Sequence, residues 1–110
     1  MPRTRAELRE ERRQLRTLYV GLFDSVAALL FRYDPIGISG GDNIDEYEPE
    51  AGTILPRLHT CQSVEDVLPI VHDEFVRWFG ANTAGQQERY KEIASEIWQI
   101  WKEGRTNIRT

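Results

Sequence analysis

The sequence predicts an all-α protein, a small bundle of four helices. Apolar residues recur at three- and four-residue spacings in four separate segments, which is the pattern of helices with one buried face. Proline and glycine fall between these segments, and none of them alternates like a half-buried strand. With 110 residues and 40% hydrophobic content, the chain has the length of a single domain over residues 1–110 that needs no disulfide.

The first helix is expected over residues 4 to 33. Pro35 ends it, because the residue before a proline resists helical angles. A helix of about 30 residues spans about 45 Å, and the later helices are shorter, so its Arg-rich end, residues 1–16, should overhang the bundle. Its apolar stripe comprises Leu8, Leu15, Tyr19, Leu22, Val26, Leu29 and Tyr33.

The second helix is expected to start near Pro49 and to be kinked or shortened at Pro56. A third helix should follow Ser63, which resembles the first residue of a capping box with Asp66 in place of Glu. Gly80 should end it. The apolar stripe of this third helix comprises Val64, Val67, Leu68, Val71, Phe75, Trp78 and Phe79.

The fourth helix is expected over residues 84–103, followed by a frayed tail at residues 105–110. Its apolar positions include Trp98 and Trp101, and we expect both to lie in the core together with Trp78. His72 falls on the polar side of the third helix and is predicted to be solvated.

An acidic loop is expected between the first and second helices. Asp34–Glu50 holds six carboxylates and no Lys or Arg, and it is the one long stretch without helical periodicity. An acidic surface attracts cationic partners. Tyr47, in the middle of the acids, is the candidate anchor because it is amphipathic and low in rotamer entropy. Two alternatives stay open: the loop only caps the bundle, and Tyr47 packs onto it.

Several acids of this segment also favour the positive end of the second helix, which narrows the candidate partner-binding residues to a smaller set. The segment Asp42–Glu48 is rich in oxygen ligands but lacks the spacing of a calcium loop, so no metal site is predicted. Nothing near the acids completes a catalytic set, so no catalytic residue, cofactor or enzymatic activity is predicted. The candidate set comprises Asp42, Asp45, Glu46, Tyr47 and Glu48.

A second charged feature is an arginine face on the first helix. Arg5, Arg9, Arg12 and Arg16 follow four-three-four spacing and share one side of the helix. Three interpretations stay open. The face is a solvated helix end, it pairs with the acidic segment within one chain or across a dimer, or it binds phosphate.

Charge and composition limit the partners. The net charge of −4 gives no reason to expect nucleic acid as the main partner. The chain has no apolar run long enough to cross a membrane, no secretory leader pattern, and a single cysteine, Cys61. A reducing cytoplasm is the expected location.

Several short segments carry a family resemblance over about residues 20 to 101. They are Asp34-Pro-Ile-Gly-Ile38, Asp45-Glu-Tyr-Glu-Pro-Glu50, Ile54-Leu-Pro-Arg-Leu58, Ser63-Val-Glu-Asp-Val67 and Glu74-Phe-Val-Arg-Trp-Phe-Gly80. This pattern resembles a group of small all-helical bacterial proteins, some of which are similar to immunity proteins of toxin systems. The resemblance implies a non-enzymatic protein that neutralises a partner through surface charge, and it assigns no contact residues.

The sequence therefore favours a protein-binding module, in its sharpest form an immunity-like inhibitor of a basic toxin. A homo-oligomeric module, such as a homodimer paired through the stripe of Leu8, Leu15 and Leu22, is an alternative. A nucleic-acid binder that uses the arginine face is another.

Overall fold

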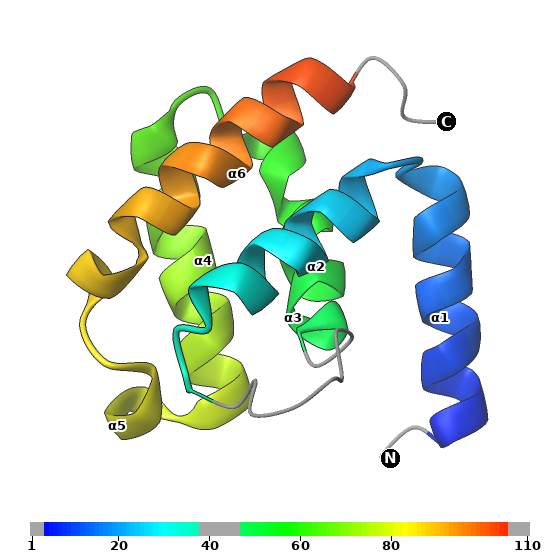
Figure 1. Cartoon of the computed structure of the whole chain (residues 1–110), viewed down its shortest axis with the longest axis horizontal. Helices are drawn as coiled ribbons and strands as arrows, with labels where there is room; N and C mark the ends of the chain where they lie inside the picture. The colour runs from blue at the N-terminus through cyan, green and yellow to red at the C-terminus, as the bar shows by residue number, and fades with distance from the viewer. Residues whose placement is uncertain (1–3, 38–46, 106–110) are drawn as a thin grey trace.

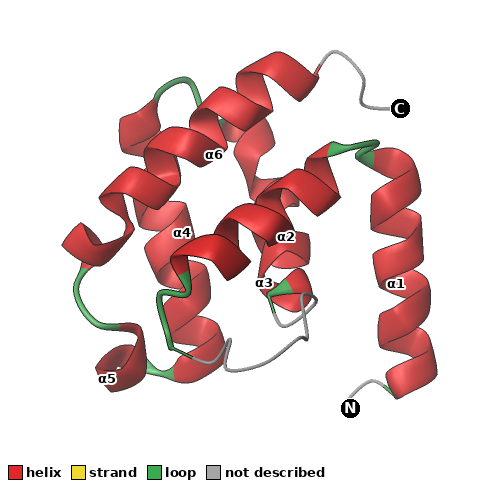
Figure 2. Ribbon diagram, in the orientation of Figure 1, coloured by secondary structure: helices red, strands yellow, loops and turns green. Residues whose placement is uncertain are grey.

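The computed structural model describes residues 4–37 and 47–105, with the side chains of Arg5 and Leu8 left out. Figures 1 and 2 show helices and connecting loops throughout this part of the chain, and it contains no strand. The all-α prediction is therefore confirmed. The elements are α1 (Arg5–Leu18), α2 (Leu22–Tyr33), α3 (Glu48–Ile54), η1 (Leu55–Thr60), α4 (Val64–Phe79), α5 (Ala81–Ala84), η2 (Gln87–Tyr90) and α6 (Lys91–Gly104), where η denotes a 3-10 helix.

The prediction of one long N-terminal helix is wrong. The segment forms two helices, α1 and α2, with a bend of 115° between them. Gly21 makes the corner with φ of +79°, a left-handed conformation that glycine adopts without strain. The corner also places Tyr19 in the core with 3% of its surface exposed. The apolar period runs through the break, so the sequence pattern alone reads as one helix.

The Arg-rich end consequently does not overhang the bundle. Helix α1 folds back and contacts α2 and α3, at the right-hand edge of Figure 1. The expected bundle of four helices is replaced by six α-helices and two 3-10 helices in the described residues. None of these helices is long and apolar enough to cross a membrane alone, and α1 from Arg9 passes that test only jointly with α2, as a bent pair.

The core lies where α2, α4 and α6 meet around the short helix α3. Helix α2 packs against α6 and α3, and α4 packs against α6, α3 and α5. Burying each large side chain contributes about 1.5–3 kcal/mol, so these contacts dominate the stability of the fold. The largest fully buried side chains include Phe23, Leu29, Leu30, Tyr47, Ile54, Leu55, Leu58, Phe75, Tyr90, Ile93 and Ile97.

The middle helices follow the prediction closely. Pro49 lies in the first turn of α3, and Pro56 lies in η1, where the α-helix has already given way to a 3-10 helix. Helix α4 ends at Gly80 as expected. The capping box at Ser63 is wrong, because the Ser63 side chain makes no capping bond and Asp66 instead accepts a 2.9 Å hydrogen bond from the backbone N–H of Gln62.

The fourth helix begins later than predicted. Gly85, with φ of +80°, separates α5 from η2, and α6 starts only at Lys91. The guanidinium of Arg89 holds this connection by donating to the carbonyls of Thr83 at 3.0 Å and Pro35 at 3.1 Å. His72 belongs to the same region and is not simply solvated, because its Nε2 donates to the carbonyl of Gly85 at 2.9 Å.

Replacing Gly21 tests the corner between α1 and α2. A Cβ at this position would meet no atom within 4 Å, so Gly21→Ala should cost only the left-handed backbone penalty. We expect a loss of about 1–2 kcal/mol in the free energy of unfolding, measured by urea denaturation. Ser25→Ala, at an exposed site in α2, is the control. Unchanged stability, or a gain in helix by circular dichroism, would contradict a left-handed conformation at Gly21.

Candidate functional site

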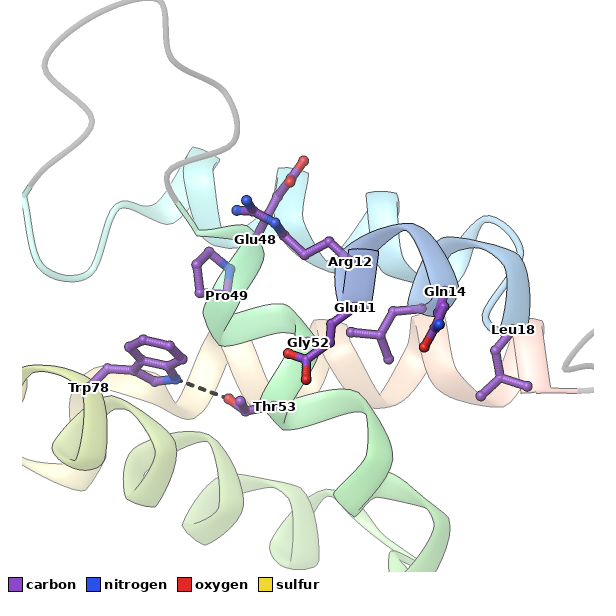
Figure 3. A pocket seen from close by; sticks show the side chains of 10 residues that line it. Glu11, Arg12, Gln14, Leu18, Glu48, Pro49, Gly52, Thr53 and Trp78 are labelled. Atoms are coloured by element: carbon purple, nitrogen blue, oxygen red, sulfur yellow. Dashed lines mark hydrogen bonds between the residues drawn. The ribbon is translucent and has the colours of Figure 1, made fainter. Parts of the chain in front are cut away.

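A groove lies between α1 and α3, closed at one end by a side chain from α4. Its volume is about 440 Å³. Figure 3 shows α1 along one side, α3 at its floor and Trp78 at the end away from Leu18. We call it the α1–α3 groove, and its lining residues are Glu11, Arg12, Gln14, Leu15, Leu18, Glu48, Pro49, Gly52, Thr53 and Trp78.

The floor of the groove depends on a close approach of two helices. A Cβ on Gly52 would lie 3.0 Å from Cδ1 of Leu15, tighter than ordinary van der Waals contact. The missing side chain therefore lets α1 approach the backbone of α3. At the far wall, the indole Nε1 of Trp78 donates a 3.1 Å hydrogen bond to Oγ1 of Thr53, which fixes the orientation of the ring.

Exposed apolar side chains concentrate at this groove. Among the described residues, the large hydrophobic side chains with the greatest exposure are Leu18 at 38%, Val20 at 48% and Trp78 at 44%, and two of these three line the groove. Grouped exposed apolar surface in a small protein marks an interaction site more often than scattered single residues do. The expectation that all three tryptophans lie in the core is correct for Trp101, which is 3% exposed, and wrong for Trp78. Trp98 is half-buried and packs against the core.

One edge of the groove is held by an ion-pair network centred on Arg16. Its Nε donates to Oδ1 of Asp24 at 3.0 Å, and its Nη2 pairs with the carboxylate of Glu48. The guanidinium also lies 4.9 Å from the ring centre of Phe23. Because the Arg16 side chain is 42% exposed, each pair contributes only about 0–1 kcal/mol. Because Glu48 belongs to the acidic segment, the structure shows at Arg16 one of the three interpretations of the arginine face, which is pairing with that segment.

The structure corrects the interpretation of Tyr47 as an exposed anchor, because its side chain is fully buried. Its hydroxyl donates to Oδ1 of Asp34 at 2.6 Å and accepts from the backbone N–H of Ile36 at 3.3 Å. Its ring lies 6.1 Å from that of Phe75. The structure therefore shows the alternative interpretation, in which Tyr47 packs onto the bundle with both its ring and its hydroxyl group.

Of the other candidate partner-binding residues, Glu48 lines the groove and pairs with Arg16. Asp42, Asp45 and Glu46 lie outside the described residues, so their role stays a prediction. The structure thus places Glu48 at the α1–α3 groove and Tyr47 in the core. The groove could not be predicted from the sequence, because Leu18 and Trp78 lie on helices whose apolar stripes are expected in the core.

A buried carboxyl lies on α3, the helix that forms the floor of the groove. Glu50 in α3 is 3% exposed, and its Oε2 has no hydrogen-bond partner among the described residues. Burial raises the pKa of Glu50 to about 7. A hydrogen bond from the residue's own backbone N–H lowers this pKa, but by less than burial raises it. The sequence contained a signal for this burial, since Tyr47, Glu50 and Ile54 are spaced so that they share one face of the helix.

In the described part of the chain, no three side chains of His, Cys, Asp or Glu are grouped so that they could hold a metal ion. Comparison with family models, with curated proteins and with solved structures found no match for this chain.

Glu50→Gln tests the buried carboxyl. The folded protein keeps the proton up to about pH 7, whereas the unfolded chain releases it near the ordinary value of 4.5. The free energy of unfolding should therefore fall as pH rises between these values, by about 3 kcal/mol at most. Urea denaturation of Glu50→Gln at pH 5 and pH 8 should show that this fall is lost. The exposed control Glu65→Gln should keep it, and equal pH dependence in both variants would contradict the assignment.

Two tryptophan variants test the division between core and groove. Trp101→Ala should lower the free energy of unfolding by about 3–5 kcal/mol, because the ring is buried. Trp78→Ala should cost about 1 kcal/mol, because the ring is 44% exposed and loses one hydrogen bond. Chemical denaturation compares the two directly, and equal losses would show that Trp78 is a core residue.

Proposed function

We propose that this protein is a non-enzymatic, protein-binding module that captures a basic partner through its acidic segment. In its sharpest form it is an immunity-like inhibitor that neutralises a basic toxin, with the cytoplasm as its expected location. The observation that carries this proposal is the way the acidic segment is held. At one end, Asp34 accepts a hydrogen bond from the buried Tyr47, and at the other end Glu48 pairs with Arg16.

This attachment matters because the acids between its two ends have no Lys or Arg among them in the sequence. Fixing both ends of a segment reduces the conformational entropy that binding would otherwise remove. A carboxylate-rich segment also raises the association rate of a cationic partner and disfavours anionic ones. Both effects favour a charge-selected protein partner over a small-molecule reaction.

The alternative of a homo-oligomer paired through the leucine stripe has less support. Leu22 is 3% exposed, and Leu15 contacts Gly52 across the α1–α3 groove, so two of the three leucines are used inside the chain. Nucleic-acid binding through the arginine face is likewise weakened, because Arg16 is occupied by Asp24 and Glu48.

Charge reversal of the acidic segment tests the proposal. The variant Asp42→Lys, Asp45→Lys, Glu46→Lys should reduce capture of the native partner at least about tenfold at physiological salt, because steering and contact both change sign. Glu48 is left intact, since its loss would release Arg16. The measurement is quantitative capture from native cells, followed by titration of the captured protein in purified form.

The matched control carries the same change of net charge elsewhere. Glu65→Lys, Glu88→Lys, Glu103→Lys alters three exposed positions on α4, η2 and α6. This variant should retain capture. Equal capture by the two triple variants would show that the acidic segment does not select the partner.

A further inference from the structure

We propose that this chain forms a dimer by exchanging α1 between two copies. In the exchanged form the corner at Gly21 straightens, α1 and α2 become one continuous helix, and α1 of each copy packs on α3 of the other. The α1–α3 groove then takes its α1 wall from one copy and its α3 floor from the other. This inference goes beyond the proposed function and does not depend on it.

The corner interrupts the backbone hydrogen bonds of a helix over a very short distance. On the α1 side, the N–H of Tyr19 donates to the carbonyl of Leu15 at 2.8 Å, and on the α2 side the N–H of Phe23 donates to the carbonyl of Tyr19 at 3.2 Å. Both bonds have the four-residue spacing of an α-helix. Only residues 19–21 lie between α1 and α2, so the change that makes the helix continuous is local.

The side chains at the corner leave room for this change. Val20 is 48% exposed, and a Cβ at Gly21 would meet no atom within 4 Å. Tyr19 is buried, but in a continuous helix it lies three and seven residues before Leu22 and Val26, on the face that α2 already buries. Straightening therefore keeps Tyr19 on the core side of the helix.

The local sequence supports a continuous helix as well as a corner. The apolar stripe runs from Leu15 through Tyr19 to Leu22 without a change of period. Gly21 has φ of +79° in the corner, and glycine also adopts the negative φ of a helix. The residue that permits the corner therefore accepts both forms.

The contacts between α1 and α3 do not require that both helices belong to one chain. Leu15 lies against the bare backbone of Gly52, and Arg16 pairs with Glu48. A continuous helix carries the 14 residues of α1, about 21 Å in length, away from their own α3 and leaves these partners uncovered. A second copy opened in the same way offers the same contacts, and reciprocal exchange closes a two-fold dimer. Each leucine stripe then packs on α3, not on the stripe of another copy.

Protein concentration and the hinge decide between the two forms. Figure 1 shows α1 at the edge of the molecule, joined to α2 by the corner. Because a short connection holds α1 beside its own α3 at an effective concentration in the millimolar range, the closed monomer is the form of a dilute solution. A short hinge favours exchange between copies, and a longer hinge disfavours it. The dimer should therefore form at high protein concentration, or when closing the corner is made costly.

Replacing Gly21 shifts this balance toward the dimer. Alanine disfavours the left-handed corner in both chains and favours the continuous helix, so Gly21→Ala should raise the association constant of the dimer at least about thirtyfold. Sedimentation equilibrium of the full chain, from micromolar to millimolar concentration, measures this constant. Ser25→Ala, the exposed control on α2, should keep the wild-type value. Dilution to micromolar concentration should return Gly21→Ala to the monomer, the form whose unfolding is measured.

A longer hinge should have the opposite effect. Two glycines inserted after Gly21 interrupt the continuous helix and let α1 reach its own α3 easily, so this variant should stay monomeric at millimolar concentration.

A second measurement separates exchange from side-by-side association. The dimer is prepared from a mixture of ¹³C-labelled and unlabelled chains, from Gly21→Ala and from the wild-type protein at millimolar concentration. An isotope-filtered nuclear Overhauser experiment then detects contacts between different chains. The exchanged dimer should show an interchain signal from a methyl group of Leu15 to Hα of Gly52, because a Cβ at Gly52 would lie only 3.0 Å from Cδ1 of Leu15.

Three results would overturn the inference. The first is that Gly21→Ala associates no more strongly than Ser25→Ala, and the second is that the dimer persists after the glycine insertion. The third is a dimer in which Leu15 contacts Gly52 only within its own chain. All of these measurements use the free protein, so their outcome is independent of partner capture and of the proposed function.

Discussion

The arrangement of this molecule depends on the hydrogen bonds made by the buried hydroxyl of Tyr47. By donating to Asp34 and accepting from the N–H of Ile36, it joins the end of α2 to the start of α3. Its ring packs near Phe75 of α4, so the same side chain fixes α3 against the core. A buried polar atom that is fully bonded stabilises one geometry and makes others costly. The base of the acidic segment, the floor of the groove and the position of α1 all follow from where α3 is held.

Helix α1 is attached to this core by a small number of contacts. The Gly21 corner turns it back, Leu15 meets the bare backbone of Gly52, and Arg16 bridges to Asp24 and Glu48. These contacts position the helix without covering the apolar surface of Leu18 and Trp78. A fold that leaves such surface exposed, and buries Glu50 without a partner for Oε2 among the described residues, gives up stability at this one place. Departures of this kind tend to gather at functional sites.

Glu48 connects the acidic segment to the α1–α3 groove. It ends the acidic segment, begins α3 and lines the groove, and its pair with Arg16 holds α1.

The amino-acid sequence by itself determined the helical class, the ends of α4, the start of α3 at Pro49 and most of the core. These depend on periodicity and on proline and glycine, which act locally. It could not determine the break at Gly21, because an apolar period of seven continues through a corner as easily as along a helix. The burial of Tyr47 and Glu50, the exposure of Trp78 and the pairing of Arg16 with Glu48 were decided only by the tertiary structure. Each depends on contacts between residues that are distant in the sequence. The local sequence around a polar or aromatic side chain does not indicate which of these residues it will contact.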